Sequence, residues 1–322
     1  ISFSSTFLAL VTALVSAWAG LGFWSLALQQ ISQSLYMIVG TWILCNWRPS
    51  LLKFSINIRS LISFGADISF YNVLNYFIRN SDKILIGKFL SPASLGLYER
   101  SYQLFLVPVS RLLPLSGVAI PAMSRLQNEP ERFTEFFIKI IRVIAYIIIP
   151  ITALLSSSSS DVVAIILGPK WSEASSVFKI LTFAGIQQCV TEPLSWIFFS
   201  LGETKILVRW AIVSAPIYIV GFVVGLNYGI IGVAIAYVIA DLLMRLLLLK
   251  LACSISLLSF KLFIQSIYRS LLIGAICFLC VTVSHEFVDI DDPFKSLLIS
   301  WGTASIPIII IITAWKDLRR DL

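Results

Sequence analysis

The sequence predicts an all-α integral membrane protein. Of its 322 residues, 58% are hydrophobic and only 13% are charged, whereas about a quarter of the residues in an average soluble domain are charged. The mean hydropathy is +0.92. Many apolar residues lie in runs of about 20, the length that a helix needs to cross a bilayer. Composition and run length together favour a bilayer over a large soluble core.

Ten apolar runs are candidates for membrane-spanning helices. They cover residues 3–19, 23–45, 61–90, 95–123, 137–156, 175–201, 206–225, 228–251, 265–284 and 296–314. The third and fourth runs are long, and they are more polar than a helix surrounded by lipid. We therefore expect about ten transmembrane helices, with polar faces on the third and fourth.

The distribution of lysine and arginine predicts the orientation, because short cytoplasmic loops are enriched in these residues. One set of loops is basic and includes Arg48, Lys53, Arg59, Arg125, Arg132, Lys205, Arg209, Lys316, Arg319 and Arg320. The opposite set is mostly acidic and includes Asp161, Glu173, Glu286, Asp289, Asp291 and Asp292. With an even number of crossings, both chain ends are expected to be cytoplasmic. The net charge of +7 follows from this bias, so no nucleic-acid partner is expected.

The third run, which contains NVLNYFIRNSDKILIGKFL, carries a polar stripe. On a helix, Asn72, Asn75, Arg79, Asp82 and Lys83 fall within a wedge of about 100°. A lone charge in hydrocarbon costs about 2.5 to 3.5 kcal/mol, so the stripe is expected to face other helices or water. Arg79 and Asp82, three positions apart, are expected to pair. The alternative is a helix end whose lysines reach the membrane interface.

The fourth run repeats the pattern. Arg100, Gln103 and Arg111 share a wedge of about 80°, and Arg111 is flanked by Pro108 and Pro114. Proline frees backbone carbonyls, which is tolerated in a membrane where protein or water binds them. Two neighbouring helices with arginine on one face predict a water-accessible pocket. Guanidinium groups bind phosphate and pyrophosphate bidentately, so an anionic ligand suits this pocket.

Other polar residues support weaker predictions. Glu192, in the sixth run, is a candidate for coupling to a cation or proton, with interhelical hydrogen bonding as the alternative. Asp241 and Arg245 are spaced as a structural i,i+4 pair. The one histidine, His285, stands beside Glu286, which would permit a dyad, although a solvated loop is the simpler interpretation. No nucleotide-binding or hydrolase motif is present, and the five cysteines lie in or beside apolar segments without zinc-ligand context. We predict no catalytic residue, metal site or cofactor.

Several short motifs occur in a specific order. They are DKILIGKFL from Asp82, LGLYERSYQL from Leu95, PAMSRLQ from Pro121, PERF from Pro130 and LGPKW from Leu167. In this order the chain resembles the bacterial polysaccharide, or lipopolysaccharide, flippases of the Wzx or colanic-acid-exporter type. These belong to the multidrug/oligosaccharidyl-lipid/polysaccharide exporter superfamily. The similarity is clearest across residues 64–180. It implies a MATE-like fold of about fourteen helices in two bundles.

The resemblance also implies a division of the chain. Residues 1–58 would be the last two helices of the N-terminal bundle, residues 59–255 the C-terminal six-helix bundle, and residues 256–322 two additional helices with a cytoplasmic tail. The chain starts at Ile1, and no basic segment precedes the first apolar run, so no signal peptide is expected. Four N-terminal helices of the family are expected to be missing, and with them much of one lobe.

By resemblance, the protein is not an enzyme. It is expected to move an undecaprenyl-pyrophosphate-linked oligosaccharide across the bacterial inner membrane, for O-antigen, capsule or exopolysaccharide synthesis, by alternating access. Membrane lipids and the polysaccharide polymerase machinery are the further partners implied. The candidate substrate-binding residues are Asn72, Asn75, Arg79, Asp82, Lys83, Arg100, Gln103 and Arg111, and Glu192 is the coupling candidate.

Two other functions stay open. A MATE-like exporter of small molecules would favour acidic cavity residues for cationic drugs, against which the arginine stripe argues. A membrane glycosyltransferase that uses lipid-linked sugars at the outer face would depend on His285, Glu286 or Asp289.

Overall fold

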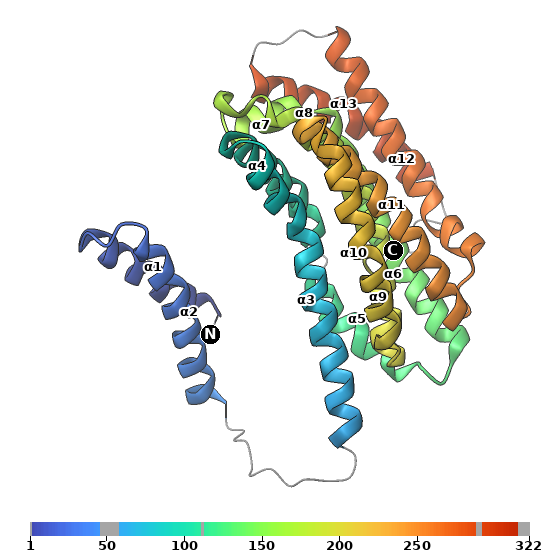
Figure 1. Cartoon of the computed structure of the whole chain (residues 1–322). Coiled ribbons are helices and arrows are strands. Elements are labelled where there is room, and N and C mark those ends of the chain that lie inside the picture. The colour runs from blue at the N-terminus through green and yellow to red at the C-terminus, as the bar shows by residue number, and fades with distance from the viewer. Residues whose placement is uncertain (1, 46–57, 111–112, 288–291, 315–322) are drawn as a thin grey trace. The chain divides into compact units, whose positions relative to one another are not determined.

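The computed structural model describes residues 2–45, 58–110, 113–287 and 292–314, and every element in these ranges is a helix (Figure 1). The helices are α1 Ser2–Trp18, α2 Trp24–Leu44, α3 Ile58–Phe89, α4 Pro92–Ser110, α5 Leu113–Arg125, α6 Pro130–Ser157, α7 Ser159–Ile166, the 3-10 helix η1 Pro169–Trp171, α8 Ala174–Thr191, α9 Leu194–Leu201, α10 Thr204–Leu226, α11 Gly229–Ile255, α12 Phe260–Phe287 and α13 Pro293–Ala314. The all-α prediction is confirmed. By its contacts the chain divides into two units, Ile1–Ile58 and Arg59–Leu322.

The first unit contains the helical hairpin of α1 and α2. Ser5, Ala9 and Ala13 of α1 are buried, and they are small enough to let the two backbones approach closely. Thr12 Oγ1 lies 3.2 Å from the hydroxyl oxygen of Tyr36 on α2. Small residues and a hydroxyl pair therefore hold two helices whose other faces are largely apolar.

In the second unit, α8 is the central helix, because it packs against α4, α6 and α11. The hairpin of α10 and α11 packs closely, and α12 runs beside α6 (Figure 1). Phe105 of α4, Phe178 of α8 and Phe222 of α10 are fully buried in one continuous core. This core positions the polar side chains of α8 and α11 inside the bundle.

Polarity is inverted relative to a soluble bundle. On α10 and α11, Val220 and Ile239 are more than half exposed, whereas Asp241 and Arg245 are buried. Five segments of the described chain are long and apolar enough to cross a membrane. They are Pro92–Arg125, Pro130–Ser157, Thr204–Leu226, Gly229–Ile255 and Phe260–His285. Charges turned inward and aliphatic side chains turned outward suit a lipid environment. The chain is a multi-pass membrane protein, and the number of ten crossings stays a prediction.

One predicted run is interrupted. The run 95–123 is no test of this, because it covers α4 and α5 and also residues 111–112, which lie outside the described residues. The run 175–201 was expected to be one helix, and this was wrong, because α8 ends at Thr191 and α9 starts at Leu194. Pro193, between α8 and α9, has no N–H to continue the hydrogen-bond ladder.

Candidate functional site: a charged cluster at a helix break

Glu192 occupies the break between α8 and α9. Its N–H still donates to the carbonyl of Gln188 at 2.7 Å, and its own carbonyl accepts from the N–H of Ser195 at 3.1 Å. Pro193 cannot donate to the carbonyl of Cys189, four positions earlier. The break therefore coincides with a carboxylate inside the bundle. Interrupted helices commonly form the substrate and ion sites of transporters.

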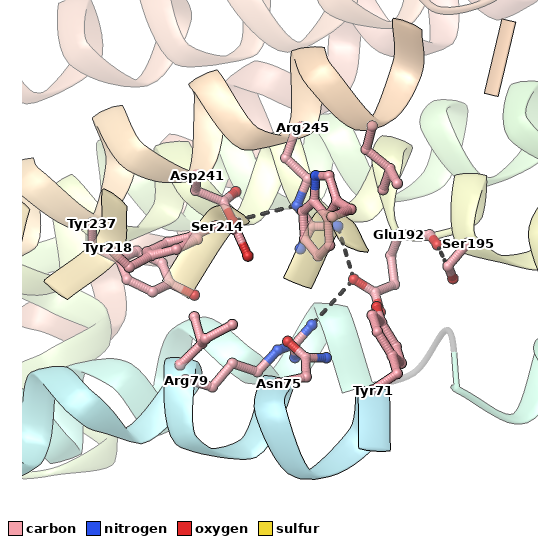
Figure 2. Close-up of a pocket in the computed structure, with 13 residues that line it drawn as sticks. Tyr71, Asn75, Arg79, Glu192, Ser195, Ser214, Tyr218, Tyr237, Asp241 and Arg245 are labelled. Atoms are coloured by element: carbon pink, nitrogen blue, oxygen red, sulfur yellow. Dashed lines mark hydrogen bonds and ion pairs between the residues drawn. The ribbon is translucent and has the colours of Figure 1, made fainter. Parts of the chain in front are cut away.

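Two arginines from other helices hold this carboxylate. Figure 2 shows Glu192 between Arg79 of α3 and Arg245 of α11. Arg79 Nη2 lies 3.2 Å from Glu192 Oε2, and Arg245 Nη1 lies 2.9 Å from the same oxygen. A carboxylate oxygen has room for two such charge-assisted hydrogen bonds. Glu192 thus links three segments that are distant in the sequence.

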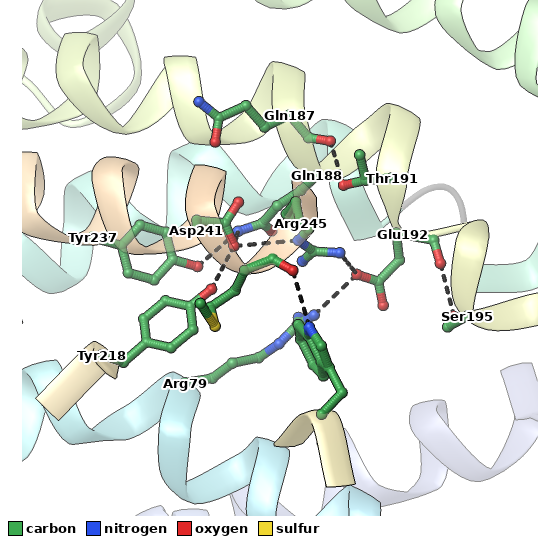
Figure 3. A network of polar contacts seen from close by, with 12 residues as sticks. Arg79, Gln187, Gln188, Thr191, Glu192, Ser195, Tyr218, Tyr237, Asp241 and Arg245 are labelled. Carbon is green, nitrogen blue, oxygen red and sulfur yellow. Dashed lines mark hydrogen bonds and ion pairs between the residues drawn. The ribbon is translucent and has the colours of Figure 1, made fainter. Parts of the chain in front are cut away.

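Asp241 completes the cluster on the α11 side (Figure 3). Its Oδ1 lies 3.3 Å from Arg245 Nε and accepts a hydrogen bond of 2.8 Å from the hydroxyl of Tyr218. Gln188 Nε2 donates to the hydroxyl oxygen of Tyr237 at 2.7 Å. The ionised cluster contains two cations and two anions, so its formal charge is zero. Pairing and hydrogen bonding are what make buried charges tolerable.

Two cavities meet at this cluster. The larger, of about 300 Å³, is open and lined in part by Asn72, Asn75, Arg79 and Glu192. The smaller cavity, of about 20 Å³, is lined by Arg79, Glu192, Asp241 and Arg245 among others. Its volume is sufficient for about one water molecule. The side chains of Arg79 and Glu192 are 32% and 21% exposed, whereas that of Arg245 is 7% exposed. The cluster therefore has an accessible front, at Arg79, and a buried rear, at Arg245.

Asp82 and Lys83 form a separate group with α4. Asp82 is fully buried, and its Oδ2 accepts a hydrogen bond of 2.8 Å from the hydroxyl of Tyr98. Lys83 Nζ lies 2.8 Å from Glu99 Oε2. The expected pairing of Arg79 with Asp82 was wrong. Asp82 accepts its hydrogen bond from Tyr98 of α4, whereas Arg79 pairs with Glu192. Asp82 joins α3 to α4 and does not line the open cavity.

Arg100 and Gln103 lie exposed on α4. Arg100 Nη1 donates to Gln103 Oε1 at 3.3 Å, and its guanidinium carbon lies 5.8 Å from the ring centre of Trp171. Gln103 Nε2 donates to Glu99 at 3.1 Å. Neither residue lines the open cavity. Arg111 lies outside the described residues.

The structure brings Asn72, Asn75, Arg79 and Glu192 together around the open cavity. The expected ion pair between Asp241 and Arg245 is confirmed, but sequence reasoning missed that Arg245 continues to Glu192. The available signal was an arginine deep within the apolar run of α11. His285 Nε2 lies 3.7 Å from Asp161 Oδ2, so its acidic partner in the structure comes from α7.

Removal of the Tyr98 hydroxyl tests the link between α3 and α4. We expect Tyr98→Phe to lower the free energy of unfolding by about 2 kcal/mol, because hydrogen bonds to charged groups contribute about 1.5 to 3 kcal/mol. Thermal unfolding of the purified protein in detergent would measure the loss. The control Tyr228→Phe changes a side chain that is 77% exposed and should leave the transition in place. An unchanged transition in Tyr98→Phe would contradict the assigned role.

The described residues thus form an all-α membrane bundle with apolar outer faces and a charged cluster beside an open cavity. Residues 1–176 match the family described as polysaccharide biosynthesis protein, and the chain belongs to this family.

Two curated relatives are similar to the chain. The teichuronic acid biosynthesis protein TuaB of Bacillus subtilis (strain 168) is 25% identical over 232 residues, which cover 71% of this chain and 48% of TuaB. The lipopolysaccharide biosynthesis protein WzxC of Escherichia coli (strain K12) is 23% identical over 203 residues, which cover 62% and 41% of the two chains. The chain thus spans less than half the length of each relative.

A solved structure shares the fold. The structure titled lipid II flippase MurJ, inward closed conformation, matches 96% of this chain and 67% of its own chain, with a TM-score of 0.66 and 17% identity. At this identity the match concerns the fold alone.

Proposed function

We propose that this chain is part of a flippase that moves an undecaprenyl-pyrophosphate-linked oligosaccharide across the bacterial inner membrane during surface polysaccharide synthesis. The observation that carries the proposal is the open cavity with Arg79 at its wall. Membership of the polysaccharide biosynthesis family supports it. The sugars and the pyrophosphate need a polar route through the bundle, while the undecaprenyl chain stays in lipid.

Within this proposal, Arg79 contacts the pyrophosphate, and Asn72 and Asn75 offer amide groups to the sugar. Both chain ends are cytoplasmic, as the loop charges predict. Residues 1–58 complete the N-terminal bundle, residues 59–255 form the C-terminal bundle, and residues 256–322 add two helices. Glu192 is the coupling residue, because its carboxylate stands at a helix break and reaches the cavity. The polymerase machinery would receive the translocated oligosaccharide.

Complementation of a flippase-deficient strain tests the proposal. In the full-length protein, Arg79→Ala should reduce surface polysaccharide at least about tenfold, because the loss of a charge-assisted contact of about 1.5 to 3 kcal/mol weakens binding by that order. The amount of protein in the membrane must match that of the unmodified protein. The control Arg132→Ala removes an arginine whose side chain is 71% exposed and should complement fully.

Full complementation by Arg79→Ala would contradict the assigned route. A further variant, His285→Asn, separates the flippase from a membrane enzyme at the outer face. A normal amount of surface polysaccharide in His285→Asn supports transport. Loss of polysaccharide in His285→Asn, together with full complementation by Arg79→Ala, would support the enzyme.

A further inference from the structure

We propose that Glu192 is a built-in substitute for the substrate's phosphate, and that Arg245 is the second arginine that binds this phosphate once Glu192 is displaced. The inference rests on the proposed function and assigns the anion position within it. It also gives Glu192 a role as an internal competitor for an anionic ligand. The ligand class is a phosphate or diphosphate group, here that of a lipid-linked sugar.

The contacts of a single oxygen atom carry the first step. Arg79 Nη2 and Arg245 Nη1 lie 3.2 Å and 2.9 Å from Glu192 Oε2. The two guanidinium groups come from α3 and α11, and the carboxylate of Glu192 links them. A phosphate oxygen makes the same charge-assisted hydrogen bonds to guanidinium groups. The position of Glu192 Oε2 is therefore a position for a phosphate oxygen.

Asp241 gives Arg245 a second carboxylate partner, so Arg245 can exchange Glu192 for a phosphate group without losing all of its counter-charge. Asp241 holds Arg245 Nε at 3.3 Å through its Oδ1, which leaves Nη1 directed toward Glu192 (Figure 3). The hydroxyl of Tyr218 in turn positions Asp241 at 2.8 Å. Asp241 therefore orients the arginine from behind and keeps one counter-charge beside it. Loss of the Glu192 contact would leave Arg245 still paired.

The side chain of Glu192 borders a cavity into which it can move when it leaves the arginines. This side chain is 21% exposed, and with Ser195 and Asn75 it lines the open cavity of about 300 Å³. Directly after Glu192, Pro193 interrupts the regular hydrogen-bond ladder between α8 and α9. A carboxylate that leaves the arginines can thus enter a polar cavity. Without substrate, Glu192 and Asp241 together neutralise the two arginines and lower the cost of burying them.

The Lys83–Glu99 pair offers no equivalent site. Lys83 is a point charge without the planar fork that binds phosphate bidentately, and its ammonium lies 4.5 Å from the ring centre of Tyr102. Neither Lys83 nor Glu99 lines the open cavity. Of these two groups of charges, the one at Glu192 therefore combines two arginines with an open cavity.

Equilibrium binding of inorganic pyrophosphate tests the inference. The full-length protein is purified in lipid nanodiscs and titrated by calorimetry, with undecaprenyl diphosphate as a second probe. We expect Glu192→Gln to bind pyrophosphate at least about tenfold more tightly than the unmodified protein, because the competing charge is gone. In the Glu192→Gln background, Arg79→Ala or Arg245→Lys should remove the gain.

The control Glu135→Gln removes the same charge from an exposed pair, in which the side chains of Glu135 and Lys139 are both 65% exposed. It should not change the affinity. Equal or weaker binding by folded Glu192→Gln overturns the inference. If Glu192→Gln does not yield a monodisperse protein, Glu192→Asp, which is one methylene shorter and still charged, should bind about threefold more tightly. Unchanged affinity in that variant is equally decisive.

Failure of the inference can be distinguished from failure of the proposed function. If Arg79→Ala abolishes complementation but Glu192→Gln leaves pyrophosphate binding unchanged, the flippase proposal stands and the competitor role falls. If Arg79→Ala complements fully, the proposed route itself is wrong. A gain for inorganic pyrophosphate without a gain for undecaprenyl diphosphate would also overturn the inference, because the substrate assigned to the site carries the lipid.

Discussion

Replacement of Arg245 by methionine is expected to lower the free energy of unfolding by about 3 to 5 kcal/mol. Removal of one partner from a buried ion pair leaves an uncompensated charge, and the cost is of this order. Arg245 is the link between Asp241, which is 1% exposed, and Glu192. Methionine fills much of the same volume but offers no hydrogen-bond donor, so both carboxylates would lose a partner.

Thermal unfolding in detergent, with the fraction of monodisperse protein as a second readout, measures this loss. The control Arg132→Met removes an arginine whose pair with Glu129 is exposed, and it should not shift the transition. The double variant Arg245→Met, Asp241→Asn should recover part of the stability, because it removes one of the stranded charges. An Arg245→Met protein as stable as the unmodified one would show that the cluster makes no net contribution.

The second large effect is expected at the crossing of α10 and α11. A Cβ added at Gly225 would lie 2.7 Å from the carbonyl oxygen of Gly232. A Cβ added at Gly232 would overlap the carbonyl oxygen of Gly225. Both obstacles are backbone atoms, so the two helices would have to separate. We expect Gly225→Ala and Gly232→Ala each to destabilise the protein by about 3 kcal/mol, toward the upper end of the usual cost of overpacking.

Gly221 is the matched control, because it lies on the same helix one turn earlier. A Cβ at this position would meet its nearest neighbours on Ala236 at 3.8 Å, an ordinary contact. Gly221→Ala should therefore be neutral to slightly stabilising, because alanine favours the helix. Fluorescence-detected size-exclusion chromatography after heating would rank the three variants. Equal melting temperatures of the three variants would contradict the close approach of the α10 and α11 backbones at Gly225 and Gly232.

Much of the fold could be predicted from the sequence. Hydropathy placed most of the long helices, because a membrane span must be both long and apolar. It did not predict the short helix α7, and it placed the start of α6 at residue 137, whereas α6 begins at Pro130. The stripe on the third run predicted that Arg79 faces the interior, which the cavity lining confirms. Helix periodicity sets such directions within one helix. Proline at position 193 was visible, but its consequence depended on whether the helix continued with a kink or stopped.

The partners in the site could not be predicted. Arg79 is separated from Glu192 by 113 positions, and local spacing favoured Asp82, only three positions away. The choice depended on which helix packs against which face. Because α4 brings the hydroxyl of Tyr98 to Asp82, that carboxylate was already engaged. Because α8 breaks at Pro193 beside α11, Glu192 meets Arg245.

The sequence by itself determined that this chain is a membrane-spanning helical protein with charges inside it, because composition and periodicity are properties of each segment alone. Only the tertiary structure decided that two of its arginines share one oxygen of Glu192. Ion pairing between helices depends on side-chain distances of a few ångströms, and these are set by how the helices pack together.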